Sequence, residues 1–420
     1  MANKVNVSSE IGQLRRVIIH RPDEGISRIS PKRSEELLFD DIVYLPKMQE
    51  EHDVFTDTLR AFLGKDNVLE TAELLQEALA FDDESKLEMV GKIVDYEELP
   101  STYKELLLGL PNDELTKVLI TGYYAAEDHF LFDPIPNFIF TRDIAVTVND
   151  HVIITKPAKV ARFRENFLTR FIVWAHPIFR KLRDEGRIIN LNRVDEFPPS
   201  KRGEMVSIEG GDVMILNEDY LLIGCSERTT SYAIKSLKDV LLRKGVIKNV
   251  VQVNIPNDRS FMHIDTVFTQ INHNHIVAYK PIVLDGLGSY VEVFSKGGMQ
   301  RQYPTVQDFI RREINPNMEF ILSGGGESPY QEREQWTDGC NLVAIKPGVA
   351  LTYDRNPKTE EAFSKAGYRV VHARELLIAF KDGILKPSEI QDTIIMLPSN
   401  ELSRARGGSH CMTCPIERAK

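Results

Sequence analysis

The stretch GDVMILNEDYLLIGCSERT, residues 211–229, contains two apolar runs separated by the polar residues 217–219. Each run is rich in Val, Ile or Leu and has the length of a strand, so the stretch predicts a strand, a turn and a second strand. Neither run alternates between apolar and polar residues. Because strands of continuous hydrophobicity are buried on both faces, we expect helices to cover this pair from outside.

The same pattern recurs elsewhere in the chain, which indicates a repeat architecture. The further copies are RDIAVTVNDHVIITKP (142–157), IDTVFTQINHNHIVAYKP (264–281) and GCNLVAIKPGVALTYDRNPKT (339–359). A shorter stretch, LRRVIIHRP (14–22), matches one strand of the pattern and is a candidate for a fifth unit.

Helical segments follow most of these copies. Residues 162–174 and 231–245 carry apolar side chains at spacings of three and four, and Thr359 is placed to cap a helix over 359–368. Radial repetition of ββα units leaves only short protected edges and encloses a central cavity. The sequence therefore predicts one compact α/β domain, residues 1–420, built as a ring of about five such units.

One segment does not fit the repeat. Between residues 46 and 123 the sequence becomes acidic and predicts amphipathic helices separated by Gly, Pro or polar residues. We interpret 46–123 as a helical subdomain inserted between the first and second units. Its acidic runs are interpreted as solvated helix faces.

Composition excludes several classes of protein. The chain has 420 residues, 42% hydrophobic and 27% charged, which is typical of a globular protein. A formal net charge of −10 argues against nucleic acid as a partner, since phosphate backbones require a basic surface. No apolar run reaches the roughly 18 to 20 residues of a membrane span, and the polar first residues lack a signal-peptide core. We therefore expect a cytoplasmic protein without membrane contact.

The final residues, GGSHCMTCPIERAK (407–420), hold Cys411 and Cys414, two of the four cysteines. A structural zinc site would require a second pair of ligands, and Cys225 and Cys340 are isolated from each other. A redox pair normally opens a helix, which the proline that follows disfavours. The remaining interpretation is a single nucleophilic cysteine with an incidental neighbour.

Ionisable residues cluster where the apolar strands begin. Asp143 ends FTRD before one strand, Glu209 and Asp212 lie in EGGD before the next, and His263 and Asp265 lie in MHID before a third. In a ring of repeats, equivalent strand ends converge, so these side chains are expected to face one cavity. An Asp or Glu at a strand end taken alone is more often a turn former.

Several carboxylates in one cleft repel each other unless a cation binds between them. A metal ion is one candidate, and a guanidinium group, whose N–H donors match carboxylates in bidentate pairs, is another. The spacing lacks the tight clusters of a dedicated metal site, and a cysteine suggests covalent chemistry at the electrophilic carbon of the cation. We favour guanidinium and expect neither a metal nor another cofactor.

Together these residues resemble a known family. The motifs are PNFIFTRD (136–143), EGGD (209–212), SERTT (226–230), MHIDTVFT (262–269) and RARGGSHCMTCPI (404–416). Their order, and the helical segment after the first unit, are similar to those of the arginine deiminases. The resemblance implies the pentein fold, a five-bladed β/α propeller.

The resemblance also implies catalytic roles. Cys411 matches the nucleophile, His263 the general acid and base, and Glu209 the carboxylate paired with that histidine. Asp143 and Asp265 match the two aspartates that grip the guanidinium nitrogens.

A second set of residues matches groups that hold the rest of the substrate. Asn137, Arg162 and Arg228 correspond to residues that bind its amino acid end. Arg406 matches the arginine of a mobile loop before the nucleophile, and Asp212 is expected to support the site from behind.

The implied reaction is hydrolysis of L-arginine to L-citrulline and ammonia, through an S-alkylthiouronium intermediate on the cysteine and with water as second substrate. Alternatives are an amidinotransferase, a hydrolase of another guanidino or ureido compound, and a non-catalytic arginine sensor. A homo-oligomer is a further expectation from the family.

Overall fold

The stretch 211–229 forms the strand pair that the sequence predicts. β8 (Val213–Asn217) pairs antiparallel with β9 (Tyr220–Cys225), and the Asn217 side chain accepts hydrogen bonds from the amides of Asp219 and Tyr220 at 2.9 and 3.1 Å. Helix α9 (Ser231–Lys244), capped by the Thr230 hydroxyl, then leads to β10 (Asn249–Asn254), which lies parallel to β9. The unit is thus an antiparallel pair, a helix and a parallel third strand.

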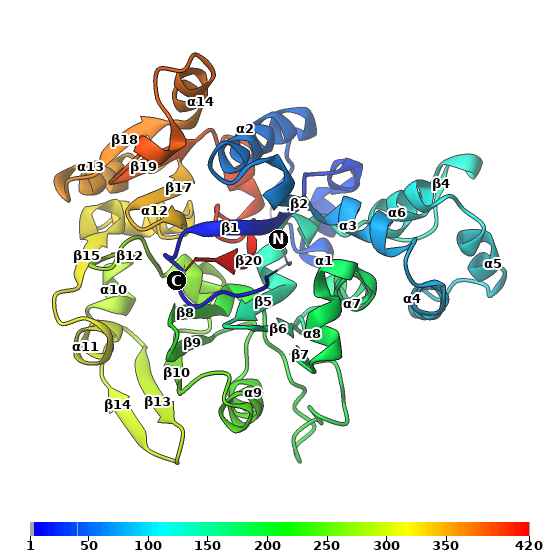
Figure 1. Ribbon diagram of the computed structural model, residues 1–420, viewed down its shortest axis with the longest axis horizontal. Coiled ribbons are helices and arrows are strands. Elements are labelled where there is room, and N and C mark those ends of the chain that lie inside the picture. The colour runs from blue at the N-terminus through cyan, green and yellow to red at the C-terminus, as the bar shows by residue number, and fades with distance from the viewer. Residues whose placement is uncertain (1–3, 40, 420) are drawn as a thin grey trace.

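The computed structural model describes residues 4–39 and 41–419, and the same unit recurs within them (Figure 1). Four further sheets contain an antiparallel pair whose second strand lies parallel to a later strand. Their members are β5 (Ala145–Val148), β6 (His151–Ile154) and β7 (Ile188–Asn190); β11 (Phe268–Gln270), β12 (His275–Ala278) and β15 (Glu319–Leu322); β16 (Val343–Lys346), β17 (Val349–Tyr353), β19 (Thr393–Leu397) and β18 (Arg369–His372); and β20 (Cys414–Arg418), β1 (Leu14–Ile19) and β2 (Val68–Glu70).

The last of these sheets joins the two ends of the described chain. β20 pairs antiparallel with β1, and β1 lies parallel to β2. The strand predicted at 14–22 is therefore completed by a strand at the other end of the chain, which the sequence had not indicated. This pairing places Cys411, three residues before β20, among the strand starts of the other units.

Helices lie outside the strands, as continuous strand hydrophobicity requires. In Figure 1 the sheets surround the centre of the molecule and the helices form its periphery. Besides α9, they are α1 (Ser34–Leu37), α2 (Leu45–Leu63), α3 (Thr71–Ala78), α4 (Asp83–Tyr96), α5 (Thr102–Leu108), α6 (Asn112–Thr121), α7 (Phe163–Ala175), α8 (Arg180–Asp184), α10 (Lys280–Val283), α11 (Val306–Phe309), α12 (Tyr330–Trp336), α13 (Pro357–Lys365) and α14 (Ala373–Lys381). None of these described helices is both long enough and apolar enough to cross a membrane.

One local expectation was wrong, and one hairpin was not predicted. Thr359 does not cap its helix, because Pro357 is already helical and Asn356 occupies the N-cap position; Thr359 instead hydrogen-bonds Glu334. A hairpin, β13 (Tyr290–Ser295) with β14 (Gln300–Tyr303), follows the third unit, and β13 pairs with β10 of the second. It extends that sheet to five strands.

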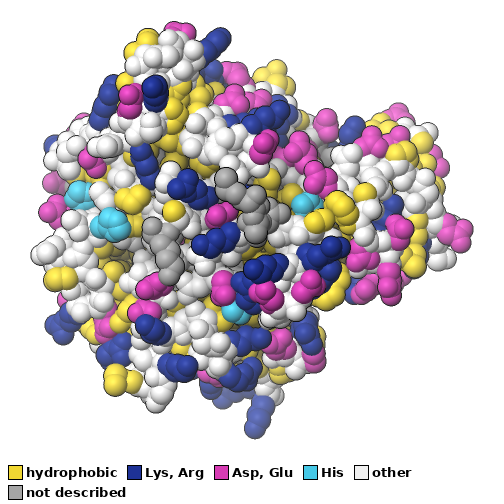
Figure 2. All heavy atoms as spheres, viewed as in Figure 1, with side chains coloured by type: hydrophobic (Ala, Val, Ile, Leu, Met, Phe, Trp, Pro, Cys, Tyr) yellow, Lys and Arg dark blue, Asp and Glu magenta, His cyan; other side chains and the backbone are white. Residues whose placement is uncertain are grey.

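The predicted insertion divides into two parts. α2 contacts β1 and α14, and β2 extends the first sheet, so the beginning of 46–123 packs as the helix and third strand of the first unit. α3 to α6 and the two-stranded pair β3 (Tyr123–Tyr124) and β4 (His129–Phe130) extend to the right in Figure 1. Acidic side chains are numerous on this region in Figure 2. The assignment of 46–123 as a subdomain stays a prediction.

Candidate active site

The ionisable residues singled out in the sequence lie directly before the first strand of four units. Asp143 ends a 3-10 turn before β5, Asp212 ends another before β8, and Asp265 lies in a third before β11. Cys411 precedes β20. These turns contact one another, because the first strands of the units converge at the centre.

The glycines of EGGD permit this close approach. A Cβ on Gly210 would lie 1.9 Å from the Arg142 carbonyl oxygen, and one on Gly211 would lie 2.6 Å from Nδ1 of His263. The backbone before β8 therefore contacts two neighbouring units directly, which explains why glycine is required in the motif.

His263 and Glu209 form a buried pair. Nε2 of His263 lies 2.9 Å from Oε2 of Glu209, and Nδ1 lies 3.9 Å from Oδ1 of Asp143. Burial alone would lower the pKa of His263, but Asp143 and the hydrogen bond to Glu209 outweigh it and raise the pKa to about 10. Burial opposes ionisation of Glu209, yet His263 and Arg162 hold its pKa below the usual range. At neutral pH the pair is an imidazolium and a carboxylate.

Arg162 is turned towards the carboxylates. Its guanidinium lies 2.5 Å from Asp143, 2.9 Å from Glu165 and 3.7 Å from Glu209, and it donates to the Asn137 carbonyl at 3.2 Å. Burial would lower the pKa of Arg162, but Glu165 and Asp143 outweigh that and raise it. The guanidinium of Arg162 therefore already lies among the carboxylates that are predicted to bind the guanidinium of a substrate.

Arg228 flanks the same carboxylate from the other side. Its NH1 lies 3.7 Å from Oε1 of Glu209, and its Nε is buried without a hydrogen-bond partner among the described residues. Two arginines thus balance the negative charge of Glu209 and Asp143, and Nε of Arg228 has an ion-pair contact with Glu227 at 3.7 Å but no hydrogen bond among the described residues.

Cys411 lies against Asp265 and Asn341. Its Sγ is 3.4 Å from Oδ2 of Asp265 and accepts a hydrogen bond from Nδ2 of Asn341 at 3.2 Å. Burial, with Asp265 and Asp143 nearby, raises the pKa of the Cys411 thiol well above its ordinary value. The sulfur is a neutral thiol in this arrangement, and a positive charge brought beside it would favour the thiolate.

Asp265 also belongs to a buried chain of polar groups. His410 lies 2.8 Å from Oδ2 of Asp265 through Nδ1 and 3.3 Å from Oε2 of Glu10 through Nε2, and Arg142 lies 3.7 Å from Glu10. Burial would raise the pKa of Asp265, but the bond from His410 outweighs it and lowers the pKa. The other oxygen, Oδ1, is buried and has no partner among the described residues.

Asp212 lies behind the site. Its Oδ1 accepts from the Ile264 amide at 2.9 Å and its Oδ2 from the Ser226 hydroxyl at 2.6 Å, and it does not line the cavity. Burial raises the pKa of Asp212 to about 7. Its bond to the Ile264 amide fixes the turn that carries His263, and its supporting role stays a prediction.

Arg406 lines the cavity. Its backbone adopts the left-handed conformation, with φ 60°. Its guanidinium carbon is 3.3 Å from the centroid of the Trp336 ring, a cation–π contact. Asp338 lies close by, and burial raises its pKa to about 7 although Arg406 opposes this. The loop before the nucleophile is thus held by a tryptophan from α12.

The cavity between these side chains is small, about 40 Å³. Ligand pockets typically have about 300–1,000 Å³, so a substrate can enter only if side chains move. The predicted site residues among its lining are Asn137, Asp143, Arg162, Glu209, Arg228, His263, Arg406 and Cys411. Asn137 donates from its side chain to the Leu37 carbonyl at 2.6 Å.

Asp143, Glu209 and His263 form the group that comes closest to a metal site in the described chain, with ligand atoms within 4.8 Å of one another. Carboxylate and imidazole ligands suit several divalent metals. The carboxylates, however, pair with Arg162 and Arg228, whose charges balance theirs. The donor set therefore fits a guanidinium better than a dedicated metal ion.

Solved structures share this fold. DDAH from Pseudomonas aeruginosa, in complex with citrulline, matches with TM-score 0.50 and 13% identity, covering 96% of this chain and 99% of that chain. The N-terminal domain of ArgZ, covalently bound to a reaction intermediate, matches with TM-score 0.51 and 13% identity, covering 96% and 98%. An amidinotransferase, SxtG from Microseira wollei, matches with TM-score 0.51 and 13% identity, covering 99% and 98%. The mixed α/β fold is therefore one found in DDAH, ArgZ and amidinotransferases.

The family follows from sequence. A model described as arginine deiminase matches residues 35–110 and 107–418. Curated relatives described as arginine deiminase are 35% identical over 446 residues in Bacillus cytotoxicus and 34% identical over 449 residues in Limosilactobacillus reuteri. Both alignments cover 100% of this chain and 99% of the relative. The chain belongs to the arginine deiminase family.

Sequence reasoning missed several residues of the site. Asn341 was one, although it directly precedes a strand of the fourth copy, GCNL, just as Asp143 does in the first. His410 directly precedes Cys411 in the sequence, but nothing in its local pattern indicated a bond to Asp265. Glu10 lies outside every repeat and gave no signal, because its contact with His410 joins distant segments. Glu165 lies in the helix after the first copy, three residues from Arg162, and its role depends on Arg162 turning towards the carboxylates.

Proposed function

We propose that this protein hydrolyses L-arginine to L-citrulline and ammonia, with Cys411 as the nucleophile. One observation carries the proposal: Cys411, His263, Glu209 and Asp143, from different units of the fold, line a single cavity. A thiol, a proton donor and acidic groups matched to a planar cation are the components that covalent attack on a guanidinium carbon requires.

Binding begins with an exchange of partners. The substrate guanidinium takes the place of Arg162 beside Asp143, and the released Arg162 pairs with the substrate carboxylate. Oδ1 of Asp265 and Nε of Arg228 make no hydrogen bond to the described residues. In the bound state Oδ1 of Asp265 accepts from the substrate guanidinium, and Nε of Arg228 donates to the substrate carboxylate. Buried polar atoms left without hydrogen bonds are costly, so these contacts favour the bound state.

The first half of the reaction forms a C–S bond. The substrate cation beside Cys411 favours loss of the thiol proton to water, and the resulting thiolate adds to the guanidinium carbon. His263, held as imidazolium by Glu209, donates a proton to the departing nitrogen, and ammonia leaves an S-alkylthiouronium group on Cys411.

The second half breaks that bond. His263, now neutral, takes a proton from water as the oxygen adds to the same carbon. The tetrahedral adduct collapses, the C–S bond breaks, the hydroxyl proton of the adduct passes to the departing sulfur, and citrulline leaves with Cys411 restored as a thiol. No electron acceptor or cofactor is required by this sequence of steps.

The finer organisation of the chain is part of the proposal. The shared topology of five sheets supports a five-bladed β/α propeller of the pentein type, with one domain over 1–420. The contacts of α2 and β2 support an inserted region shorter than 46–123, starting near α3. A cytoplasmic location, a homo-oligomeric state and the lack of a nucleic acid partner stay predictions.

Incubation with arginine, agmatine and citrulline in parallel tests the function. Arginine should release ammonia and yield citrulline without any amine acceptor, whereas agmatine, which lacks the carboxylate, should react far more slowly. Ammonia release only in the presence of an acceptor amine would identify an amidinotransferase. Binding of arginine without product would identify a sensor.

A further inference from the structure

A second cavity lies between α4 and α7, away from the candidate active site. It has a volume of about 440 Å³ and shares no lining residue with the cavity around Cys411. This volume falls within the range of about 300–1,000 Å³ typical of ligand pockets. The proposed reaction assigns no role to it.

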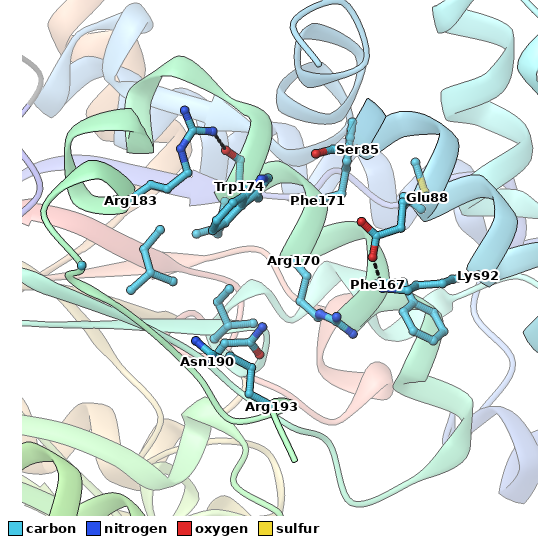
Figure 3. A pocket seen from close by; sticks show the side chains of 15 residues that line it. Ser85, Glu88, Lys92, Phe167, Arg170, Phe171, Trp174, Arg183, Asn190 and Arg193 are labelled. Atoms are coloured by element: carbon cyan, nitrogen blue, oxygen red, sulfur yellow. Dashed lines mark hydrogen bonds and ion pairs between the residues drawn. The ribbon is translucent and has the colours of Figure 1, made fainter. Parts of the chain in front are cut away.

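The cavity has aromatic walls. Phe167, Phe171 and Trp174 line it from α7, and Met89 lines it from α4 (Figure 3). Trp174 is 51% exposed, although it is among the largest apolar side chains of the protein. A flat apolar molecule would remove this surface from water, which is favourable by about 25 cal/mol for each Å² buried.

Charges in the cavity are mainly positive. Lys92, Arg170, Arg183 and Arg193 line it together with a single acidic residue, Glu88. The pairing of these groups is unequal. Lys92 pairs with Glu88, Arg183 donates to the Trp174 carbonyl at 2.6 Å, and Arg193 pairs with Asp195 at 2.6 Å.

Arg170 differs from the other three cations. Within residues 4–39 and 41–419 it makes neither a hydrogen bond nor an ion pair, and its ring contact is with Phe167 at 5.8 Å. Its side chain is partly buried, which lowers its pKa although Glu88 opposes this. Figure 3 shows its side chain in the cavity together with Glu88, Lys92 and Phe167 of the lining. Its donors are thus available to an anion inside the cavity.

We propose that the α4–α7 cavity binds a small organic anion with a planar apolar body. Arg170 pairs with the carboxylate or phosphate of this ligand, and Trp174, Phe167 and Phe171 contact its ring. L-arginine does not fit this description, because it carries a guanidinium and lacks a planar apolar body. The cavity is therefore a binding site separate from the proposed reaction.

The two tryptophans of the chain allow a direct test. In a Trp336→Phe variant Trp174 is the sole tryptophan, so energy transfer from it reports binding in this cavity. The probe is 1-anilinonaphthalene-8-sulfonate, an aromatic anion, and N-phenyl-1-naphthylamine is its uncharged counterpart. We expect saturable energy transfer to the anion and affinity for the uncharged compound at least about tenfold lower.

Substitutions identify the positive charge that binds the anionic probe. Arg170→Gln should weaken binding of the anionic probe by about tenfold or more, since it removes hydrogen bonds to a charged group. Arg170→Lys should retain part of the affinity, and Arg243→Gln, an exposed arginine on α9, should retain all of it. Equal binding of the two probes by the unaltered cavity, or undiminished binding by folded Arg170→Gln, would overturn the proposal.

Competition distinguishes the two sources of such an anion. Indole-3-acetate represents aromatic carboxylates, and adenosine 5′-monophosphate represents nucleotides. Displacement of the probe by one of them supports the proposal and identifies the class. Failure of both to displace it at millimolar concentration contradicts the proposal.

Discussion

The candidate active site and the α4–α7 cavity lie at opposite ends of the same helix. Arg162 immediately precedes α7 and Glu165 lies in its first turn, whereas Trp174 lies in its last turn. The first cavity has about 40 Å³ and the second about 440 Å³. The chemical groups are concentrated in the smaller one, which shows that cavity volume alone does not locate a reaction in this molecule.

What separates the two regions is how their charges are paired. In the site, Asp143 and Glu209 are paired with His263 and Arg162, and the pKa of His263 is raised to about 10. In the α4–α7 cavity, Arg170 has no such partner among the described residues. Strongly perturbed ionisable groups in a buried cluster are typical of catalysis, whereas an unpaired cation between aromatic rings is typical of binding.

The largest effect should come from the nucleophile. Cys411→Ser is expected to lower the rate of citrulline formation by about 10⁴-fold or more, because a serine hydroxyl is far less ionised than a thiol. The measurement is ammonia release by the folded variant. Cys414→Ser is the matched control: Cys414 is also buried, on β20, but its thiol donates to the Ala145 carbonyl and to no catalytic candidate among the described residues, so activity should persist. Turnover near the unaltered rate in Cys411→Ser would refute the assignment.

Loss of His263, the general acid and base, should give the second largest decrease in activity. His263→Ala is expected to lower kcat by about 10²–10⁴-fold, the usual contribution of a positioned proton donor. The covalent adduct should then form slowly or persist, which intact mass spectrometry detects. Normal turnover without any change in adduct level would show that His263 has only a structural role.

Loss of the Asn341 side chain should lower the activity of the same site by a smaller factor. Its Oδ1 accepts from the amides of His410 and Cys411 at 3.1 and 3.2 Å, so Asn341→Ala is expected to misplace the sulfur and lower kcat by about 10²-fold. The rate of Cys411 alkylation by iodoacetamide should change as well. An altered melting temperature with normal kcat and alkylation would limit Asn341 to stability.

The buried imidazolium predicts a pH dependence of stability. Because the folded-state pKa of His263 is raised to about 10 from 6.5, its stabilisation is complete below about pH 6.5 and is lost as pH rises through about 10. Urea unfolding at pH 7 and pH 10.5 should show a loss of more than about 1 kcal/mol. The loss should be smaller in His263→Gln; an equal loss in both proteins would assign the effect to other groups.

The smallest effect should come from the second cavity. Arg170→Gln is expected to leave kcat/KM for arginine unchanged and to alter the free energy of unfolding by less than about 0.5 kcal/mol, since it breaks no ion pair. Steady-state kinetics and urea titration measure both. A large loss of activity would mean that the two ends of α7 are not separate sites.

Local sequence patterns predicted much of this molecule. The pairs β5–β6, β8–β9 and β11–β12, and helices α7 and α9, lie where continuous hydrophobicity and helical spacing placed them. The candidate residues also converge, because each precedes a strand whose equivalents meet at the centre. The cap at Thr359 was wrong because the start of a helix depends on a proline two residues earlier, and the β13–β14 hairpin was missed because its residues are only half buried.

The amino-acid sequence by itself determined the repeated strand pairs and the acidic, histidine and cysteine residues beside them, since strand and turn preferences act over a few neighbouring residues. Tertiary structure alone decided that β20 completes the sheet of β1, that Arg162 turns inward onto Asp143, and that Asn341 and His410 hold the sulfur and Asp265. Those contacts join segments up to several hundred residues apart. They form only when burial of the whole core brings the segments together. The buried charges are then removed from water and pair with one another.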